Sequence, residues 1–293
     1  KHSWYPGHNC QVHKYHIFNL IIISINLTEL ILIIITLLVG GKIIGIASVG
    51  LAVHLVAFII SYLFIKKTFR WFKIKKVKIS LLFFKKIFYP SISFMVPNLS
   101  SSLIIQGTII FIGTTLNNNL LIFYNSMRIV LNGFKQIISI YTISHCPEIL
   151  IFFTKNKFEK VVNIYKSLLK NNAFISIASI LFLILFIKEP FLYWTKGAVE
   201  WELNFFLIFL FACSLEWLNL PTITLPYAIN QHTGLNKVHF LNFIVYWIML
   251  LFLFDTLNLY AVPTALLISA LYFLIHNFIY TKNILNIHLL KNS

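Results

Sequence analysis

Two basic residues, Arg128 and Lys135, lie inside one long apolar stretch of the sequence. A charge in the middle of a membrane-spanning helix costs about 2.5–3.5 kcal/mol, so a charged residue kept there is a candidate for function. The two are seven residues apart, which places them two turns apart on one face of a helix. We interpret them as substrate-binding residues on the wall of a cavity, where the Arg128 guanidinium can hold two oxygens of a phosphate at once.

Two acidic residues, Glu29 and Glu216, lie midway along other apolar stretches. A carboxylate held inside a membrane protein can take up a proton or bind Na⁺, so both are candidates for ion coupling. A structural alternative stays open for all four charged residues. The bases can pair with the acids across helices, or their long side chains can reach the membrane surface.

A polar patch precedes the two bases in the sequence. Its members are Asn98, Ser100, Ser101, Ser102 and Gln106. Such small polar residues can line a cavity, but they also serve the close packing of membrane helices, and both interpretations stay open.

Other kinds of chemistry find little support in the sequence. We find no glycine-rich phosphate loop, no catalytic triad spacing and no metal-ligand cluster, so we predict no catalytic residue, no metal and no cofactor. A group of His and Cys residues stands at the N-terminus, where metal binding competes with a plain polar flank as the interpretation. Its members are His2, His8, Cys10, His13 and His16.

The composition indicates a membrane protein, so these residues must be positioned by membrane-spanning helices. Of the 293 residues 59% are hydrophobic and 11% are charged, with a mean hydropathy of +0.84, whereas soluble domains carry about 25% charged residues. A spanning helix needs about 20 apolar residues, and we predict an all-α membrane bundle with eight of them. The predicted spans are about 17–39, 43–65, 90–116, 120–146, 173–187, 204–228, 238–254 and 261–280.

Two of these spans carry further expectations. The fifth has an alternative start near Leu168, and the sixth is expected to break near Pro221 and Pro226. In the connector before the fifth, apolar residues recur at helical spacing between Phe158 and Leu169. This spacing predicts an amphipathic helix that lies on the membrane surface.

Basic residues gather on one side of the spans. Nine of them and no acid lie between Lys66 and Lys86, and short loops of this kind stay in the cytoplasm. With eight spans, seventeen basic residues fall on that side and three on the other. We therefore predict a multi-pass protein with a cytoplasmic C-terminus. The formal charge of +16 is expected to face anionic lipids or an anionic substrate, and no nucleic acid, because the bases cap apolar helices.

A resemblance to a known family rests on three short segments in the fourth predicted span and directly after it. These are Phe123-Tyr124-Asn125-Ser126-Met127-Arg128, then Gln136, then Cys146-Pro147-Glu148 before a basic connector. They resemble the eighth spanning helix of the polysaccharide (O-antigen) flippases, in the multidrug/oligosaccharidyl-lipid/polysaccharide exporter superfamily. The stretch 88–116 resembles the preceding helix, and the basic loop resembles the linker between the two six-helix lobes. His145-Cys146 departs from the family, which usually carries an aromatic residue there.

The resemblance implies a twelve-helix, two-lobe transporter of which this chain is an N-terminally truncated piece. Residues 1–86 would hold the last two helices of the N-terminal lobe and the basic linker, and residues 87–293 the C-terminal lobe. The implied function is a flippase of the bacterial inner membrane that moves an undecaprenyl-pyrophosphate-linked oligosaccharide for lipopolysaccharide or related polysaccharide biosynthesis. It would work by alternating access, with H⁺ or Na⁺ coupling. Arg128 and Lys135 would meet the pyrophosphate.

Three alternatives compete with this function. An ion-coupled multidrug or metabolite exporter of the same superfamily would need an acidic cavity for cations, whereas the spans hold at least as many bases as acids. A membrane enzyme of polysaccharide assembly, such as a polymerase or acyltransferase, would need a sizeable loop. The longest outer loop, 188–203, is small for a catalytic platform, and its Glu200 and Glu202 keep this alternative open. The chain could also be a fragment without a function of its own.

Overall fold

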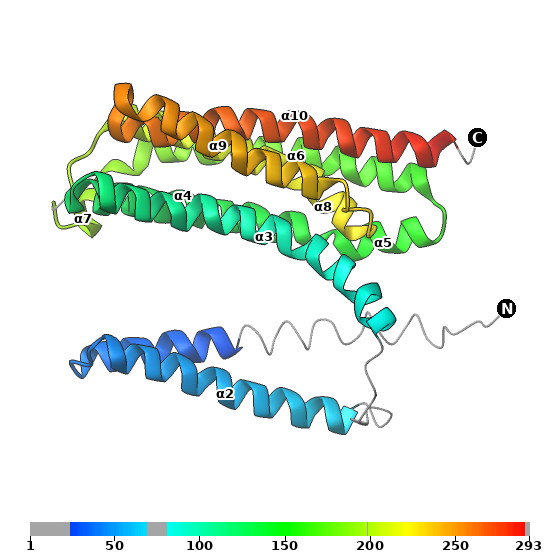
Figure 1. Ribbon diagram of the computed structural model, residues 1–293, viewed down its shortest axis with the longest axis horizontal. Coiled ribbons are helices and arrows are strands. Elements are labelled where there is room, and N and C mark those ends of the chain that lie inside the picture. Colours follow the sequence, from blue (N-terminus) through cyan, green and yellow to red (C-terminus); the bar gives the residue numbers. More distant parts are fainter. Residues whose placement is uncertain (1–23, 69–80, 198, 291–293) are drawn as a thin grey trace. The chain divides into compact units, whose positions relative to one another are not determined.

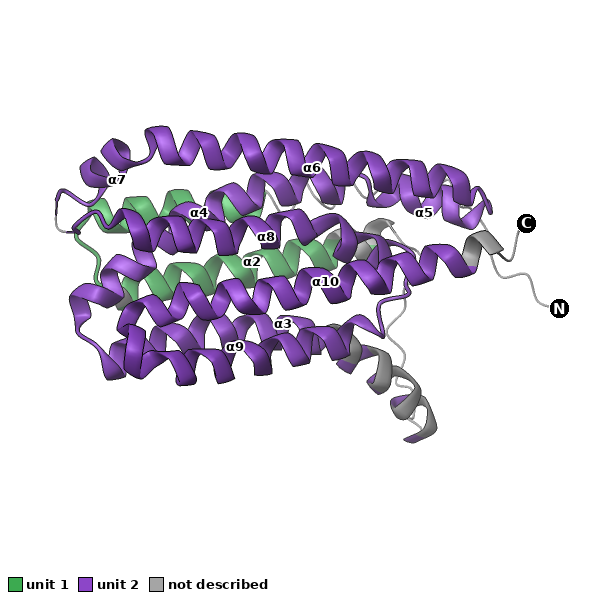
Figure 2. Ribbon diagram, turned by 90° about the horizontal axis from the view of Figure 1, so that it is seen from above, with its two compact units in different colours: residues 1–80 green, residues 81–293 purple. Residues whose placement is uncertain are grey.

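The computed structural model describes residues 24–68, 81–197 and 199–290, and none of these residues forms a β-strand. The chain divides into two compact units, residues 1–80 and residues 81–293 (Figure 2). The predicted domain boundary at residue 86 falls close to this division, and the assignment of the two pieces to lobes of a larger transporter stays a prediction.

Unit 1 contains a helical segment, Ser24–Leu38, and helix α2, Ile43–Thr68. The turn between them is made by two glycines. Gly40 has a φ of 80°, a conformation that favours glycine. A Cβ atom on Gly41 would lie 2.5 Å from the side chain of Thr36. The turn therefore forms where the sequence supplies residues without side chains.

Unit 2 consists of six long helices, two short helices and a 3₁₀ turn within the described residues (Figure 1). In chain order they are α3 (Leu81–Thr115), α4 (Asn118–Ser144), α5 (Cys146–Thr154), α6 (Phe158–Phe186), α7 (Lys188–Trp194), α8 (Leu203–Ala228), α9 (Leu235–Leu257), η1 (Asn258–Tyr260) and α10 (Ala261–Leu290).

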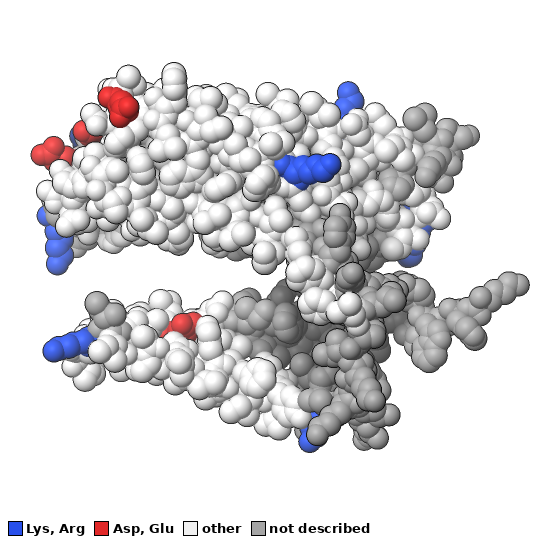
Figure 3. Space-filling model, viewed as in Figure 1, with Lys and Arg blue, Asp and Glu red and all other residues white. Residues whose placement is uncertain are grey.

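The distribution of apolar side chains is that of a membrane protein. Among the described residues, six helical stretches are long and apolar enough to cross a membrane, and the last of them contains both α9 and α10. Phe252 is 77% exposed, whereas Asn277 is 0% exposed. Many large apolar side chains thus face outward, as a hydrocarbon solvent allows, while the Asn277 amide lies inside the bundle. In the view of Figure 3, most of the surface of unit 2 is uncharged, and the acidic side chains gather toward one end of its helices.

Helix α8 is the centre of unit 2. Half of its span is buried, and it packs against α4, α5, α6 and α10. It runs unbroken through Pro221 and Pro226, where the sequence predicted a break. Pro226 has no N–H to give to the carbonyl oxygen of Thr222, but Thr281 of α10 donates its hydroxyl to that oxygen at 2.7 Å. The neighbouring helix therefore satisfies the group that the proline frees.

Helix α3 packs closely on α9. Gly107 lies under Trp247, because a Cβ atom at position 107 would stand 2.5 Å from that indole ring. One residue along, the Thr108 hydroxyl donates to the carbonyl oxygen of Ile104 at 2.5 Å. The same oxygen atom of Thr108 lies 2.6 Å from the Tyr246 hydroxyl, so Tyr246 is the donor of that second bond. These contacts fix the register of α3 against α9.

Each of the eight predicted spans coincides with a helix of the described residues, with 24–38 as the described part of the first. The differences lie in the connections. The amphipathic stretch that begins at Phe158 continues into the fifth span as one helix, α6. Its apolar stripe is buried in the bundle at Val161, Tyr165 and Leu168 instead of lying on a membrane surface. The short helices α5 and α7 were not predicted.

Candidate functional site

Helix α4 presents a polar stripe to a cavity inside unit 2. Arg128, Asn132 and Lys135 all line this cavity, and their spacing of four and three residues keeps them on one helix face. The helix begins at a regular cap, where the Asn117 side chain accepts a hydrogen bond from the backbone N–H of Leu120 at 2.9 Å. The sequence-based expectation that Arg128 and Lys135 share one face is therefore met in the structure.

The guanidinium of Arg128 has a partner on its own helix. Its Nη2 and Nε atoms donate to Oδ1 of Asn125 at 2.7 and 3.1 Å. Asn125 is one turn earlier on α4, so this contact orients the guanidinium without neutralising it. Arg128 keeps its full charge and further N–H groups toward the cavity that it lines.

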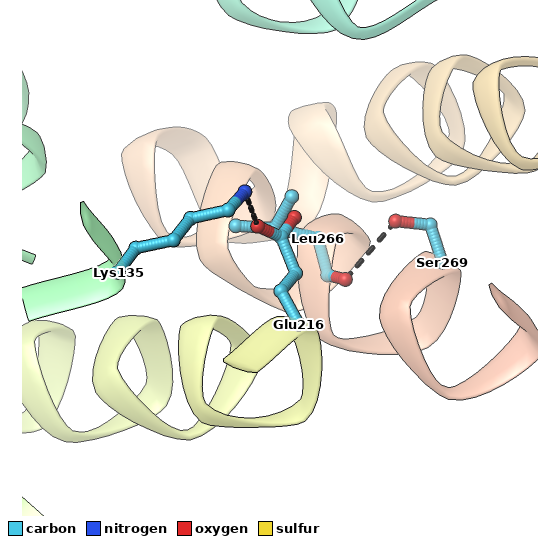
Figure 4. Close-up of polar contacts among 4 residues, drawn as sticks. All are labelled: Lys135, Glu216, Leu266 and Ser269. Atoms are coloured by element: carbon cyan, nitrogen blue, oxygen red, sulfur yellow. Dashed lines mark hydrogen bonds and ion pairs between the residues drawn. The ribbon is translucent and has the colours of Figure 1, made fainter. Parts of the chain in front are cut away.

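Lys135 forms an ion pair with Glu216 of α8 (Figure 4). Lys135 Nζ lies 2.6 Å from Glu216 Oε2, which is a short, charge-assisted hydrogen bond. The nearby hydroxyl of Ser269 on α10 donates to the carbonyl oxygen of Leu266 at 3.0 Å and so stays within its own helix. The two side chains are 37% and 28% exposed, so the pair is partly open. The pairing alternative considered for Lys135 thus holds, and both partners also line the cavity.

The cavity has a volume of about 180 Å³. Helices α3, α4, α8, α9 and α10 line it, and all of them belong to unit 2. Its charged side, which we call the charged wall, consists of Arg128, Lys135 and Glu216. Two cations against one carboxylate leave this wall with one net positive charge at neutral pH.

Uncharged polar side chains from α3 and α9 line another part of the cavity. Ser100 and Ser101 of α3 line the cavity together with His239 and Asn242 of α9. We call these four residues the neutral wall. Tyr246 follows on the same face of α9, but its hydroxyl is engaged with α3, as described above.

Only two of the four residues of the neutral wall were predicted from the sequence. Ser100 and Ser101 belong to the predicted polar patch, whereas the other members of that patch do not line the cavity. His239 and Asn242 were missed. Their signal was the spacing of polar positions at 239, 242 and 246 in an otherwise apolar helix, which marks one helical face.

The remaining predicted acid, Glu29, belongs to unit 1. A Cβ atom added to Gly50 of α2 would lie 3.2 Å from Oε1 of Glu29. The carboxylate therefore packs over a position of α2 that carries no side chain. A role of Glu29 or Glu216 in ion coupling stays a prediction.

The loop considered as an enzyme platform is partly helical. Its first half forms α7 (Lys188–Trp194), and Glu202 accepts a hydrogen bond from the Tyr260 hydroxyl at 2.9 Å. Among the described residues, no group of three His, Cys, Asp or Glu side chains could hold a metal ion. The N-terminal His and Cys residues lie outside the described part of the chain.

The fold is similar to that of a known transporter structure. The chain aligns with the "crystal structure of MATE in the bent conformation" with a TM-score of 0.69 and 16% sequence identity. The alignment covers 93% of this chain and 62% of that chain, so the chain spans less than two thirds of the MATE chain. No protein-family model matches the sequence, and no curated protein matches it. The likeness establishes the all-α, multi-pass membrane fold.

Proposed function

We propose that the protein is a membrane transporter that moves an anionic lipid-linked oligosaccharide across a bacterial inner membrane by alternating access. The MATE-like fold supports transport as the general activity. The resemblance of the Phe123–Arg128 region to polysaccharide flippases supports undecaprenyl-pyrophosphate-linked repeat units as the substrate class. On this proposal the protein is not an enzyme, and its C-terminus faces the cytoplasm.

The net positive charge of the cavity carries the proposal. Arg128 and Lys135, the two Lys or Arg residues within the spans that the sequence predicts for unit 2, lie on one cavity wall, and the carboxylate of Glu216 accompanies them. An exporter of organic cations needs the reverse balance, because like charges repel the ligand in a region of low dielectric. A phosphate or pyrophosphate group would be attracted by Arg128, which is oriented but not neutralised.

The ion pair suggests how ligand binding connects to an ion. An anion that takes over Lys135 leaves Glu216 without its partner in a cavity walled by apolar helices. An unpaired carboxylate in such a place is costly, and it is relieved by a proton or by Na⁺. Glu216 is therefore our candidate for the coupling residue, with the ion taken up as the anion binds.

The test measures binding to the purified protein in lipid nanodiscs. Farnesyl diphosphate serves as the anionic probe and tetraphenylphosphonium as the cationic one. We expect the diphosphate to bind and the Lys135→Met variant to weaken it about tenfold or more, because a charge-assisted contact contributes about 1.5–3 kcal/mol. The matched control Lys166→Met removes an exposed charge from α6 and should change the affinity less than twofold.

Two results would count against the proposal. Binding of tetraphenylphosphonium without binding of farnesyl diphosphate would favour the multidrug exporter. Equal losses in Lys135→Met and Lys166→Met would mean that overall charge, and not the cavity, attracts the diphosphate.

A further inference from the structure

Two atoms of the neutral wall have no hydrogen-bond partner among the described residues. They are Nε2 of His239 and Oδ1 of Asn242, and both atoms are buried. The two residues are three positions apart on α9 and line the same cavity. They therefore present unused hydrogen-bonding capacity at one place.

Unpartnered buried atoms of this kind call for an explanation. About 90% or more of buried polar groups in proteins have a partner, and an exception indicates a ligand or water that completes the site. Tyr246, one turn further along the same face, shows the ordinary situation, because its hydroxyl is bonded to Thr108. Oδ1 of Asn236, also on α9, is buried and without a partner among the described residues, but Asn236 does not line the cavity. His239 and Asn242 differ in that both line one cavity, where a ligand can reach them.

The chemistry of the wall favours a neutral ligand group with hydroxyls. Serine hydroxyls, an amide and an imidazole can each exchange hydrogen bonds with hydroxyl groups, and none of them needs a charge on the ligand. The phosphate-binding cations stand on the other wall. Phe273 of α10 also lines the cavity and meets the His239 ring edge to face at 4.7 Å. This contact fixes the imidazole in its orientation.

The size of the cavity limits what the wall can hold. Its volume of about 180 Å³ lies below the roughly 300–1,000 Å³ of pockets for drug-sized ligands. It is suited to one small ring beside a phosphate, and too small for a whole oligosaccharide.

We infer that the neutral wall is a sugar-binding subsite. It binds the ring attached directly to the phosphate, while the charged wall binds the phosphate itself. His239 and Asn242 are the specificity-determining residues of this subsite. The inference rests on the proposed function, because it assumes a ligand whose anionic group is esterified to a sugar.

The experiment compares two probes on the purified protein in nanodiscs, farnesyl diphosphate and the same molecule carrying one glucose. The quantity measured is the gain in affinity that the glucose brings. For the unchanged protein we expect a gain of about tenfold, which corresponds to one or two hydrogen bonds. Asn242→Leu should remove most of this gain and leave the affinity for farnesyl diphosphate within twofold.

Two further variants keep the result interpretable. Asn236→Leu is the matched control, because Oδ1 of Asn236 is also buried and unpartnered on α9 but does not line the cavity. It should leave the gain unchanged. His239→Phe keeps a ring against Phe273 and removes the nitrogen atoms, so it tests the wall if Asn242→Leu fails to fold.

The remaining outcomes separate this inference from the proposed function. If farnesyl diphosphate binds but glucose brings no gain, the sugar subsite is wrong and the phosphate site stands. The same holds if the gain survives in both Asn242→Leu and His239→Phe, or if these variants weaken both probes equally. If neither probe binds the unchanged protein, the proposed function fails and the subsite fails with it.

Discussion

The two walls of the cavity differ in whether their polar groups have partners within the protein. On the charged wall each cation already has a partner, Glu216 for Lys135 and Asn125 for Arg128. On the neutral wall, His239 and Asn242 keep buried atoms that find no partner in the described part of the chain. The free-energy cost of leaving each kind of group without a partner explains the difference. An unsatisfied neutral group costs about 1–3 kcal/mol, whereas an uncompensated buried charge costs more.

This difference assigns the walls different parts in ligand binding. A ligand that engages Lys135 must displace Glu216, so binding there is an exchange, whereas Arg128 keeps N–H groups for the ligand. A ligand on the neutral wall makes hydrogen bonds that the protein's own side chains do not make there, so binding there is an addition. Variants that remove one wall at a time should therefore give effects of different kind and size.

The largest effect is expected for Lys135 in cells whose polysaccharide export depends on this protein, as the proposed function requires. Lys135→Ala should abolish export of surface polysaccharide at an unchanged protein level, because it removes the cation that the phosphate would engage. Lys135→Arg should retain part of the export, since it keeps the charge. Ile140→Ala changes an outward-facing residue of the same helix, 69% exposed, and should export normally. Normal export by Lys135→Ala would leave the charged wall with a structural role only.

Reversal of the ion pair should have a large effect on stability. Lys135→Glu or Glu216→Lys alone places like charges in contact, and each should lower the free energy of unfolding by about 1–3 kcal/mol. This is less than the roughly 3–5 kcal/mol for a broken, fully buried pair, because these side chains are 37% and 28% exposed. The double variant should recover most of the loss in a thermal unfolding assay in detergent. Additive losses would show that the pair contributes nothing as a pair.

An effect of similar size on stability is expected where α3 supports the neutral wall. Gly107→Ala should destabilise the protein by about 1–3 kcal/mol, as overpacking does, because the new Cβ atom would stand 2.5 Å from Trp247. Gly113→Ala is the control on the same helix. Its Cβ atom would meet Leu121 at 3.4 Å, an ordinary contact. Equal melting temperatures for the two variants would contradict the close packing of α3 on α9.

The smallest effect is expected for the hydrogen bond from Thr281 of α10 to the carbonyl oxygen of Thr222 on α8. Thr281→Val should cost about 0.6 kcal/mol, the average for such bonds between membrane helices. Pro226→Ala restores an N–H to the carbonyl oxygen of Thr222, so the cost of Thr281→Val should fall in that background. A double-mutant cycle by unfolding measures the coupling. Equal costs in both backgrounds would mean that Thr281 does not compensate for the proline.

The eight spans were predictable because a hydrocarbon solvent imposes long apolar helices, and their length appears directly in the sequence. The short helices α5 and α7 were not, because nine and seven residues carry too little periodicity. The start of α6 was misplaced because its first half is amphipathic. Such a stretch can pack its apolar stripe on neighbouring helices or on a membrane surface, and hydropathy alone does not distinguish the two.

The candidate site was predictable only within one helix. The spacing of Arg128 and Lys135 fixes a shared face, and the structure places both on the cavity. The choice between Glu29 and Glu216 as partner of Lys135 stayed open, because helix spacing does not say which helices are neighbours. His239 and Asn242 were missed for the same reason. A polar face on α9 acquires meaning only when α3 and α10 close a cavity in front of it.

The bond from Thr281 to Thr222 also has a mechanical consequence. A helix with an interior proline has lost one of the bonds that resist bending, but here that bond is replaced from outside the helix. Rotation of α8 about its own axis, or sliding along α10, would break it. Together with the packing of α10 on α8, this bond opposes relative movement of the two helices near the position that carries Glu216. On the proposed transport cycle we therefore expect separation of Glu216 from Lys135 to involve displacement of α4 relative to α8 and α10.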